Sequence, residues 1–252
     1  MSPALLEPAE HAFAVLRRAR ARGERFVGAL LPGSTARRMQ AAAVVDEWAA
    51  ANLDTHHDPG PLWVVLGDGA SLGLGASTRV AGYVCLVAEA LAAADGATWR
   101  VVNLAEPGAD LDAVLTRQLP ELAALTAETP AALVTCVLAA ADVSGRPQEA
   151  EARLRTLLAA LPAGAVVATL PVTRRSRSAA ALNATLREEA ARHGLRVVDV
   201  WDDSRRRGRW FGPQYHPNDV GHAAWARTVL AAVRPTAERP GEAPCPSETV
   251  QD

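Results

Sequence analysis

The side chains best suited to acid–base chemistry are spread along the chain and follow strand-like stretches. His216 lies in YHPNDVGHAAWA (215–226), Glu106 follows a valine-rich stretch that ends at 104, and Asp142 follows another that ends at 139. Histidine can accept a proton near neutral pH, and a carboxylate beside it can orient the ring. This set would allow hydrolysis by a water molecule that His216 activates, provided that Glu106 or Asp142 approaches it.

A structural interpretation of the same motifs stays open. His216 can simply pack in the turn before the last expected helix, with Asn218 and Asp219 as caps and His222 on the first helical turn. The Asp68 carboxylate can likewise tie down the turn that follows the first strand. These roles require no reaction.

Alternating strand and helix patterns predict the scaffold that positions these residues. The strand-like runs are rich in valine and nearly continuous, which is typical of parallel strands covered on both faces. Strands are expected at 62–67, 99–104, 132–139, 165–171 and 195–200. Helices are expected between and after them, at 77–94, 110–126, 148–161, 178–193 and 219–233. The prediction is an α/β fold with a three-layer, doubly wound, parallel five-stranded sheet, whose site lies at the carboxyl ends of the strands.

We expect three segments along the chain. Residues 1–60 form a helical N-terminal extension and linker, with helices at 8–22 and 35–52. Residues 61–234 form the α/β domain, and residues 235–252 form a disordered tail rich in Pro, Glu and Ser.

Composition narrows the classes of partner. The chain has 252 residues and a net charge of -2, which gives no drive toward nucleic acid or an anionic membrane. No apolar run approaches the ~20 residues of a membrane span, and acidic residues precede the first basic one, unlike in a signal peptide. Three cysteines at irregular spacing favour neither disulfides nor zinc. We expect a cytoplasmic protein with no metal and no cofactor.

Four blocks resemble the SGNH (GDSL-type) esterase family. They are VVLGDGASLGLGAS (64–77), VVNLAEPGAD (101–110), VTCVLAAADV (134–143) and YHPNDVGHAAWA (215–226). They occur in the family's order, and the resemblance covers roughly residues 40–234. It implies an SGNH hydrolase fold of flavodoxin-like topology.

The resemblance also assigns positions to the family's catalytic machinery. In the family, the serine of G-D-S attacks the ester, a histidine is the base, and an aspartate three residues before it orients the ring. The serine N–H, a glycine N–H of the second block and an asparagine of the third block bind the oxyanion. This chain matches at His216 and Gly108 only. The serine position is Gly69, the asparagine position is Ala141 and the aspartate position is Pro213.

Arginines follow the fourth and fifth expected strands. Arg174 and Arg175 lie in TRRSR, and Arg205 and Arg206 lie in SRRRGR. At the site edge of the sheet they can bind an anionic group, in a binding set that also includes Asp68, Glu106 and Asp142. A solvated basic surface is the preferred interpretation, because all 26 basic residues of the chain are arginine.

Three hypotheses follow. The leading one is a pseudoenzyme, inactive as a serine esterase, that can bind a small-molecule ester or an anionic ligand. The second is an active enzyme of this lineage with altered chemistry, either hydrolysis by water that His216 activates or a non-hydrolytic reaction. The third is a structural or interaction protein, whose signature would be bulky apolar side chains packed over Gly69.

Overall fold

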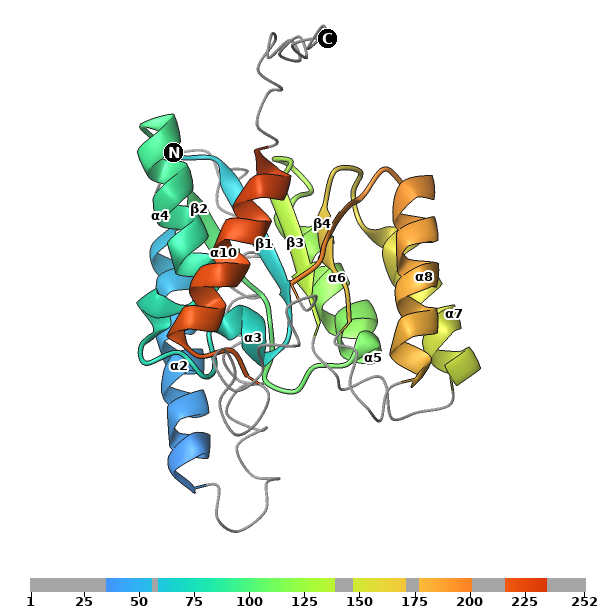
Figure 1. Cartoon of the computed structure of the whole chain (residues 1–252). Helices are drawn as coiled ribbons and strands as arrows, with labels where there is room; N and C mark the ends of the chain where they lie inside the picture. Colours follow the sequence, from blue (N-terminus) through green and yellow to red (C-terminus); the bar gives the residue numbers. More distant parts are fainter. Residues whose placement is uncertain (1–34, 56–58, 139–146, 171–176, 201–215, 235–252) are drawn as a thin grey trace, which may run out of the picture.

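The expected strands form one parallel sheet in the order β2-β1-β3-β4-β5 (Figure 1). The computed structural model describes residues 35–55, 59–138, 147–170, 177–200 and 216–234. The strands are β1 (Leu62–Gly67), β2 (Arg100–Asn103), β3 (Leu133–Val137), β4 (Val166–Ala168) and β5 (Arg196–Val198). This flavodoxin-like order confirms the predicted fold class. It also puts the carboxyl ends of β1 and β3 at the point where the strand order reverses, which is where such sheets bind ligands.

Strand β1 lies at the centre of the sheet, and all six of its residues are buried. Val64 is paired with Val102 of β2 on one side and with Val134 of β3 on the other. The two faces of β1 contribute to different cores, because successive side chains point to opposite sides of a strand. Val64 belongs to one core and its neighbours Trp63 and Val65 to the other.

Helices cover both faces of the sheet (Figure 1). One core includes side chains from α5 (Leu111–Ala113), the π-helical turn η4 (Val114–Gln118), α6 (Leu119–Leu125), α7 (Pro147–Ala160) and α8 (Arg177–Arg192). The other core includes side chains from α2 (Thr35–Asp54), α3 (Gly69–Leu72), α4 (Tyr83–Asp95) and α10 (Asp219–Val233). None of the helices that the structure describes is long and apolar enough to cross a membrane.

Helix α2, from the expected N-terminal extension, packs directly on the sheet domain. Its Trp48 side chain is buried, and the indole Nε1 donates to the Leu72 carbonyl at 2.9 Å. The Asn52 side chain bonds both backbone groups of Asn103, donating to its carbonyl and accepting from its N–H, each at 2.9 Å. These contacts join α2 to the residues around the end of β2. The expected helix at 8–22 and the expected tail at 235–252 lie outside the described residues.

Two expected helices differ in detail. The helix expected at 77–94 is split into η3 (Arg79–Ala81) and α4, because Gly82 between them is extended, with ψ 148°. The helix expected at 110–126 runs from Leu111 to Leu125 but contains the π-helical turn η4.

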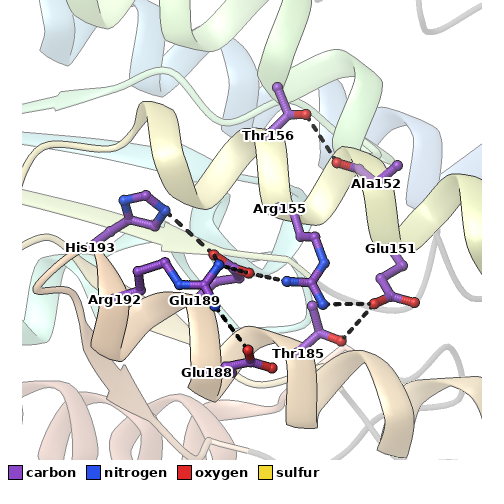
Figure 2. Close-up of polar contacts among 9 residues, drawn as sticks. All are labelled: Glu151, Ala152, Arg155, Thr156, Thr185, Glu188, Glu189, Arg192 and His193. Carbon is purple, nitrogen blue, oxygen red and sulfur yellow. Dashed lines mark hydrogen bonds and ion pairs between the residues drawn. The ribbon is translucent and has the colours of Figure 1, made fainter.

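A buried carboxylate joins α7 to α8. Glu189 is 3% exposed, and three basic side chains converge on it (Figure 2). Arg155 of α7 pairs with Glu189 Oε1, Arg192 donates to the same oxygen at 3.1 Å, and His193 Nε2 lies 3.5 Å from Oε2. A second acceptor, Glu151, bonds Arg155 at 3.0 Å.

Candidate functional site

The turn after β1 has a fixed backbone. Gly67 has a φ of 135°, and a Cβ there would lie 2.0 Å from the Val137 carbonyl oxygen, so only glycine fits. The buried Gln118 side chain holds both backbone groups of Gly67. Its Oε1 accepts from Gly67 N at 2.8 Å, and its Nε2 donates to Gly67 O at 2.9 Å. The turn that carries the site is thereby tied to η4.

Asp68 starts α3. Its buried carboxylate accepts from Ala70 N at 2.9 Å, which is the geometry of an N-cap. Its own N–H donates to the Val137 carbonyl at 3.3 Å and so joins the turn to the end of β3. The capping contact is the structural role expected for Asp68.

Ser71 does not take the place of a nucleophile. It is fully buried, and its hydroxyl lies within 3.3 Å of the carbonyl oxygens of Leu66 and Val137 and 3.0 Å from the Tyr83 hydroxyl. Burial raises the pKa of Tyr83 well above its ordinary range, so the phenol stays protonated. Ser71 therefore contacts the strand ends and Tyr83.

Gly69 and His216 lie side by side. An ideal Cβ built on Gly69 would lie 3.1 Å from His216 Cε1, so the position matched to the family's serine adjoins the position matched to its histidine. The same Cβ would lie 2.7 Å from Leu74 Cδ1. Leu74, which is partly buried against the core of the α4 and α10 face, therefore lies beside Gly69, and its terminal methyl would have to shift if position 69 carried a side chain.

His216 has no partner for one ring nitrogen. Its Nδ1 is buried and makes no hydrogen bond with any residue that the structure describes. Burial lowers the pKa of His216 below its ordinary value of 6.5, so the ring is neutral at neutral pH. A neutral imidazole can accept a proton, but no carboxylate among the described residues orients this one through Nδ1.

The residues after His216 connect the site to α10. Asn218 is the N-cap of that helix, and its side-chain oxygen accepts from Gly221 N at 3.0 Å. Asp219, also expected to cap α10, accepts instead from Ser77 N at 2.7 Å, and this hydrogen bond lowers its pKa. The carboxylate thus holds the loop before η3 against the start of α10.

His222 is completely buried on the first turn of α10. Its Nδ1 accepts from Tyr83 N, so its proton lies on Nε2, which donates to the Leu74 carbonyl; both distances are 3.3 Å. The ring also stacks on Tyr83, with the two planes 13° apart. Burial is the main cause that lowers the pKa of His222 to about 4.

Glu106 is paired within its own region. The Arg117 guanidinium binds its carboxylate with both Nε and NH2, at distances from 2.7 to 3.1 Å, and this bond raises the pKa of Arg117. Glu106 N also donates to Gly67 O at 3.2 Å, which brings the loop after β2 beside the site turn. Gly108 lies exposed in that loop, with φ 69°.

The other predicted site residues lie outside the described residues. They are Ala141, Asp142, Arg174, Arg175, Arg205, Arg206 and Pro213. Among the residues that are described, no group of three His, Cys, Asp or Glu side chains is placed to hold a metal ion.

Sequence reasoning missed Gln118, Leu74 and the contacts of His222. Gln118 lies 51 positions from the glycine it binds, and His222 lies 148 positions from Leu74. The sequence carried one signal for Leu74, which is a large apolar residue between Gly73 and Gly75 in a loop of small residues.

Comparisons with known proteins agree with this geometry. The model of the GDSL-like Lipase/Acylhydrolase family matches residues 65–224. A comparison with curated proteins finds no match.

Solved structures share the fold. LAE5, an alpha/beta hydrolase enzyme from the metagenome of Lake Arreo, Spain, is 22% identical, with a TM-score of 0.57 over 71% of this chain and 97% of that chain. Axe2, an acetylxylan esterase from Geobacillus stearothermophilus, is 20% identical, with a TM-score of 0.56 over 69% and 94%. A member of the lipolytic protein G-D-S-L family from Veillonella parvula is 15% identical, with a TM-score of 0.58 over 68% and 97%.

Proposed function

Because the chain belongs to the GDSL-like lipase/acylhydrolase family, we propose that it is a member that does not perform serine ester hydrolysis. The observation that carries this proposal is the glycine at position 69, where the resemblance places the family's serine nucleophile. A glycine has no atom to attack a carbonyl carbon, and Leu74 Cδ1 lies 2.7 Å from where even a Cβ would be.

The orientation of the base supports the same conclusion. In a triad the acid holds the imidazole by the ring nitrogen that faces away from the nucleophile. In this chain His216 Nδ1 is buried without a partner among the described residues. The resemblance places Pro213 at the acid position, and a proline side chain cannot accept a hydrogen bond. His216 is thus a base position without its orienting group.

The size of the loss follows from the missing groups. Removal of a triad nucleophile costs about 10⁶ in turnover, and removal of one oxyanion donor, here the amide replaced by Ala141, costs about 10²–10³. The effects do not add, because a triad without its nucleophile has little activity left to lose. Backbone donors and binding can still supply about 10³ over water.

Hydrolysis by activated water is the weaker candidate. It needs a water molecule beside His216 at the place where the serine hydroxyl would be, and the Leu74 Cδ1 methyl lies next to that place. It also needs a carboxylate that orients His216. Glu106 is bound to Arg117, and Asp142 lies outside the described residues. The leucine beside Gly69 is an apolar contact that a structural or interaction role would also have. Two further predictions stay. One is that the arginines after β4 and β5 bind an ester or an anionic ligand, and the other is that the protein is cytoplasmic.

An esterase assay tests the proposal. The purified chain and its His216→Ala variant are incubated with p-nitrophenyl acetate and p-nitrophenyl butyrate, beside a buffer blank. We expect both proteins to release nitrophenol at the same low rate. Turnover at least about 10-fold above the blank that disappears in His216→Ala would refute the proposal, because the family base would then be at work.

Restoration of the family residues separates two causes of inactivity. The triple variant Gly69→Ser, Ala141→Asn and Pro213→Asp supplies nucleophile, oxyanion amide and acid together. Regained ester hydrolysis would show that the scaffold is intact and only reactive groups are missing. Continued inactivity in a folded variant would show that the space around position 69 has itself been rebuilt.

A further inference from the structure

The segment from Gly73 to Gly75 brings Leu74 back over the start of α3. Leu74 N donates to the Gly69 carbonyl at 2.9 Å. Gly75 has a φ of 94°, and a Cβ there would lie 2.4 Å from the Pro217 carbonyl oxygen and 2.8 Å from His216 Cβ. Only glycine permits this approach, so the main chain beside Leu74 lies directly against His216.

The other backbone group of Leu74 is bound by His222. The Leu74 carbonyl accepts from His222 Nε2, and His222 Nδ1 accepts from the N–H of Tyr83 at the start of α4. The imidazole therefore bridges α4 and the Leu74 segment from its own position on α10. Because the ring is fully buried, no water competes for these two bonds.

We infer that His222 is a positioning residue that fixes the Leu74 main chain and thereby keeps the Leu74 side chain over Gly69, next to His216. This inference rests on the proposed function, because it concerns how the same filled position is maintained. His222 acts through Leu74, and it is the neutral ring that accepts from Tyr83 and donates to Leu74.

The inference has a local consequence that a general packing role would not have. His216 is partly exposed, and when the Leu74 segment is released the leucine side chain can leave Gly69 and more water can reach the His216 ring. Burial is the cause that lowers the pKa of His216, so exposure returns that pKa toward its ordinary value. The His216 pKa therefore reports whether the site is closed.

The experiment is an NMR titration of the His216 Cε1 proton in the full chain. The variants are Leu74→Ala, which removes the closing side chain, and His222→Phe, which keeps a ring of similar size but loses both hydrogen bonds. We expect each to raise the His216 pKa by about 0.5 unit or more. His222 is neutral above about pH 5, given a pKa of about 4, so its replacement removes no charge from the window of the titration.

Val229→Ala is the matched control. Val229 is fully buried on α10 and belongs to the same core as Trp225. This variant therefore loses stability without touching the Leu74 carbonyl. We expect it to leave the His216 pKa within about 0.2 unit of the wild-type value. His222→Asn, whose amide is too short to reach both partners, provides a second release variant and should resemble His222→Phe.

Two results would overturn the inference. One is a wild-type His216 pKa in the folded His222→Phe or His222→Asn variant, and the other is an equal rise in Val229→Ala. Neither result touches the proposed function, which fails instead by His216-dependent ester turnover in the wild-type chain. The two claims are therefore tested separately.

Discussion

Glu189 and His216 are both titratable side chains with buried polar atoms, but their surroundings differ. Glu189, between α7 and α8, is approached by Arg155, Arg192 and His193 (Figure 2). His216, just before α10, has a buried Nδ1 without a partner among the described residues. The first region satisfies its buried charge, as stable proteins almost always do. The second region leaves a buried nitrogen without a hydrogen bond to any described residue.

The difference also has a local origin. Two of the Glu189 partners lie three and four residues further along the chain, Arg192 at the end of α8 and His193 just after it, so the end of the helix brings them together. His216 lies before the first residue of α10, so no preceding helical turn brings a partner to its ring.

The largest expected effect is a loss of stability in mild acid. His222 has a folded-state pKa of about 4 against an ordinary value of 6.5, so the unfolded chain binds the proton first as the pH falls. The free energy of unfolding is at its full value above about pH 6.5 and falls by about 3 kcal/mol by about pH 4. The lowered pKa of His216 acts in the same direction. Urea unfolding at a series of pH values measures this slope.

His222→Phe is the control for that slope. The variant has no proton to bind at this position, so most of the decline between pH 6.5 and 4 should disappear. An unchanged slope would mean that the decline comes from other groups.

The second effect concerns the satisfied region. We expect Glu189→Ala to lower the free energy of unfolding by about 2 kcal/mol, below the 3–5 of a fully buried pair. The reason is that Arg155 and Arg192, 40% and 59% exposed, can regain water when the carboxylate is lost. Urea unfolding measures the change.

Glu188→Ala is the matched control for Glu189. Glu188 is 59% exposed, lies next to Glu189 and pairs with Arg192 at 3.0 Å. An exposed pair of this kind contributes roughly 0.5 kcal/mol or less. Equal losses in the two variants would mean that the buried Glu189 carboxylate stabilises the fold no more than an exposed pair does.

The smallest effect is expected at His216. His216→Phe keeps a ring of similar size and removes a buried nitrogen that no described residue binds, so the free energy of unfolding should change by less than about 1 kcal/mol, or even rise. Thermal unfolding measures this change. A loss of more than about 2 kcal/mol would show that the His216 ring nitrogens stabilise the fold and that the two regions are alike.

The strands and most helices could be predicted because their signals are local. Valine-rich runs such as that of β1 are buried on both faces, and the order of strands and helices in the chain leaves few ways to connect a parallel sheet. The break between η3 and α4 was missed because Gly82 is extended where its Cα packs against Gly73, and a Cβ would lie 3.0 Å away. How closely Gly73 and Gly82 approach depends on the turns around them, so the local sequence does not reveal the contact.

The site could be predicted only in part, for a related reason. Family motifs located Gly69 and His216, and the structure brings them together. The occupation of the space by Leu74 depends on the backbone angles of a loop, which no residue pattern specifies. The clamp by Gln118 depends on a side chain that meets Gly67 across 51 positions.

The extra residue of the π-helical turn η4 sets the direction of the Gln118 amide. An α-helix rotates by about 100° per residue, so deletion of one residue from Val114–Gln118 would restore regular α-helical winding. Either the Gln118 amide or the chain before the deletion would then rotate about the helix axis. The backbone N–H and carbonyl of Gly67, which the Gln118 side chain now binds, would then be buried without these hydrogen bonds. A single-codon deletion in this short stretch should therefore be far less tolerated than one in the exposed loop around Gly96.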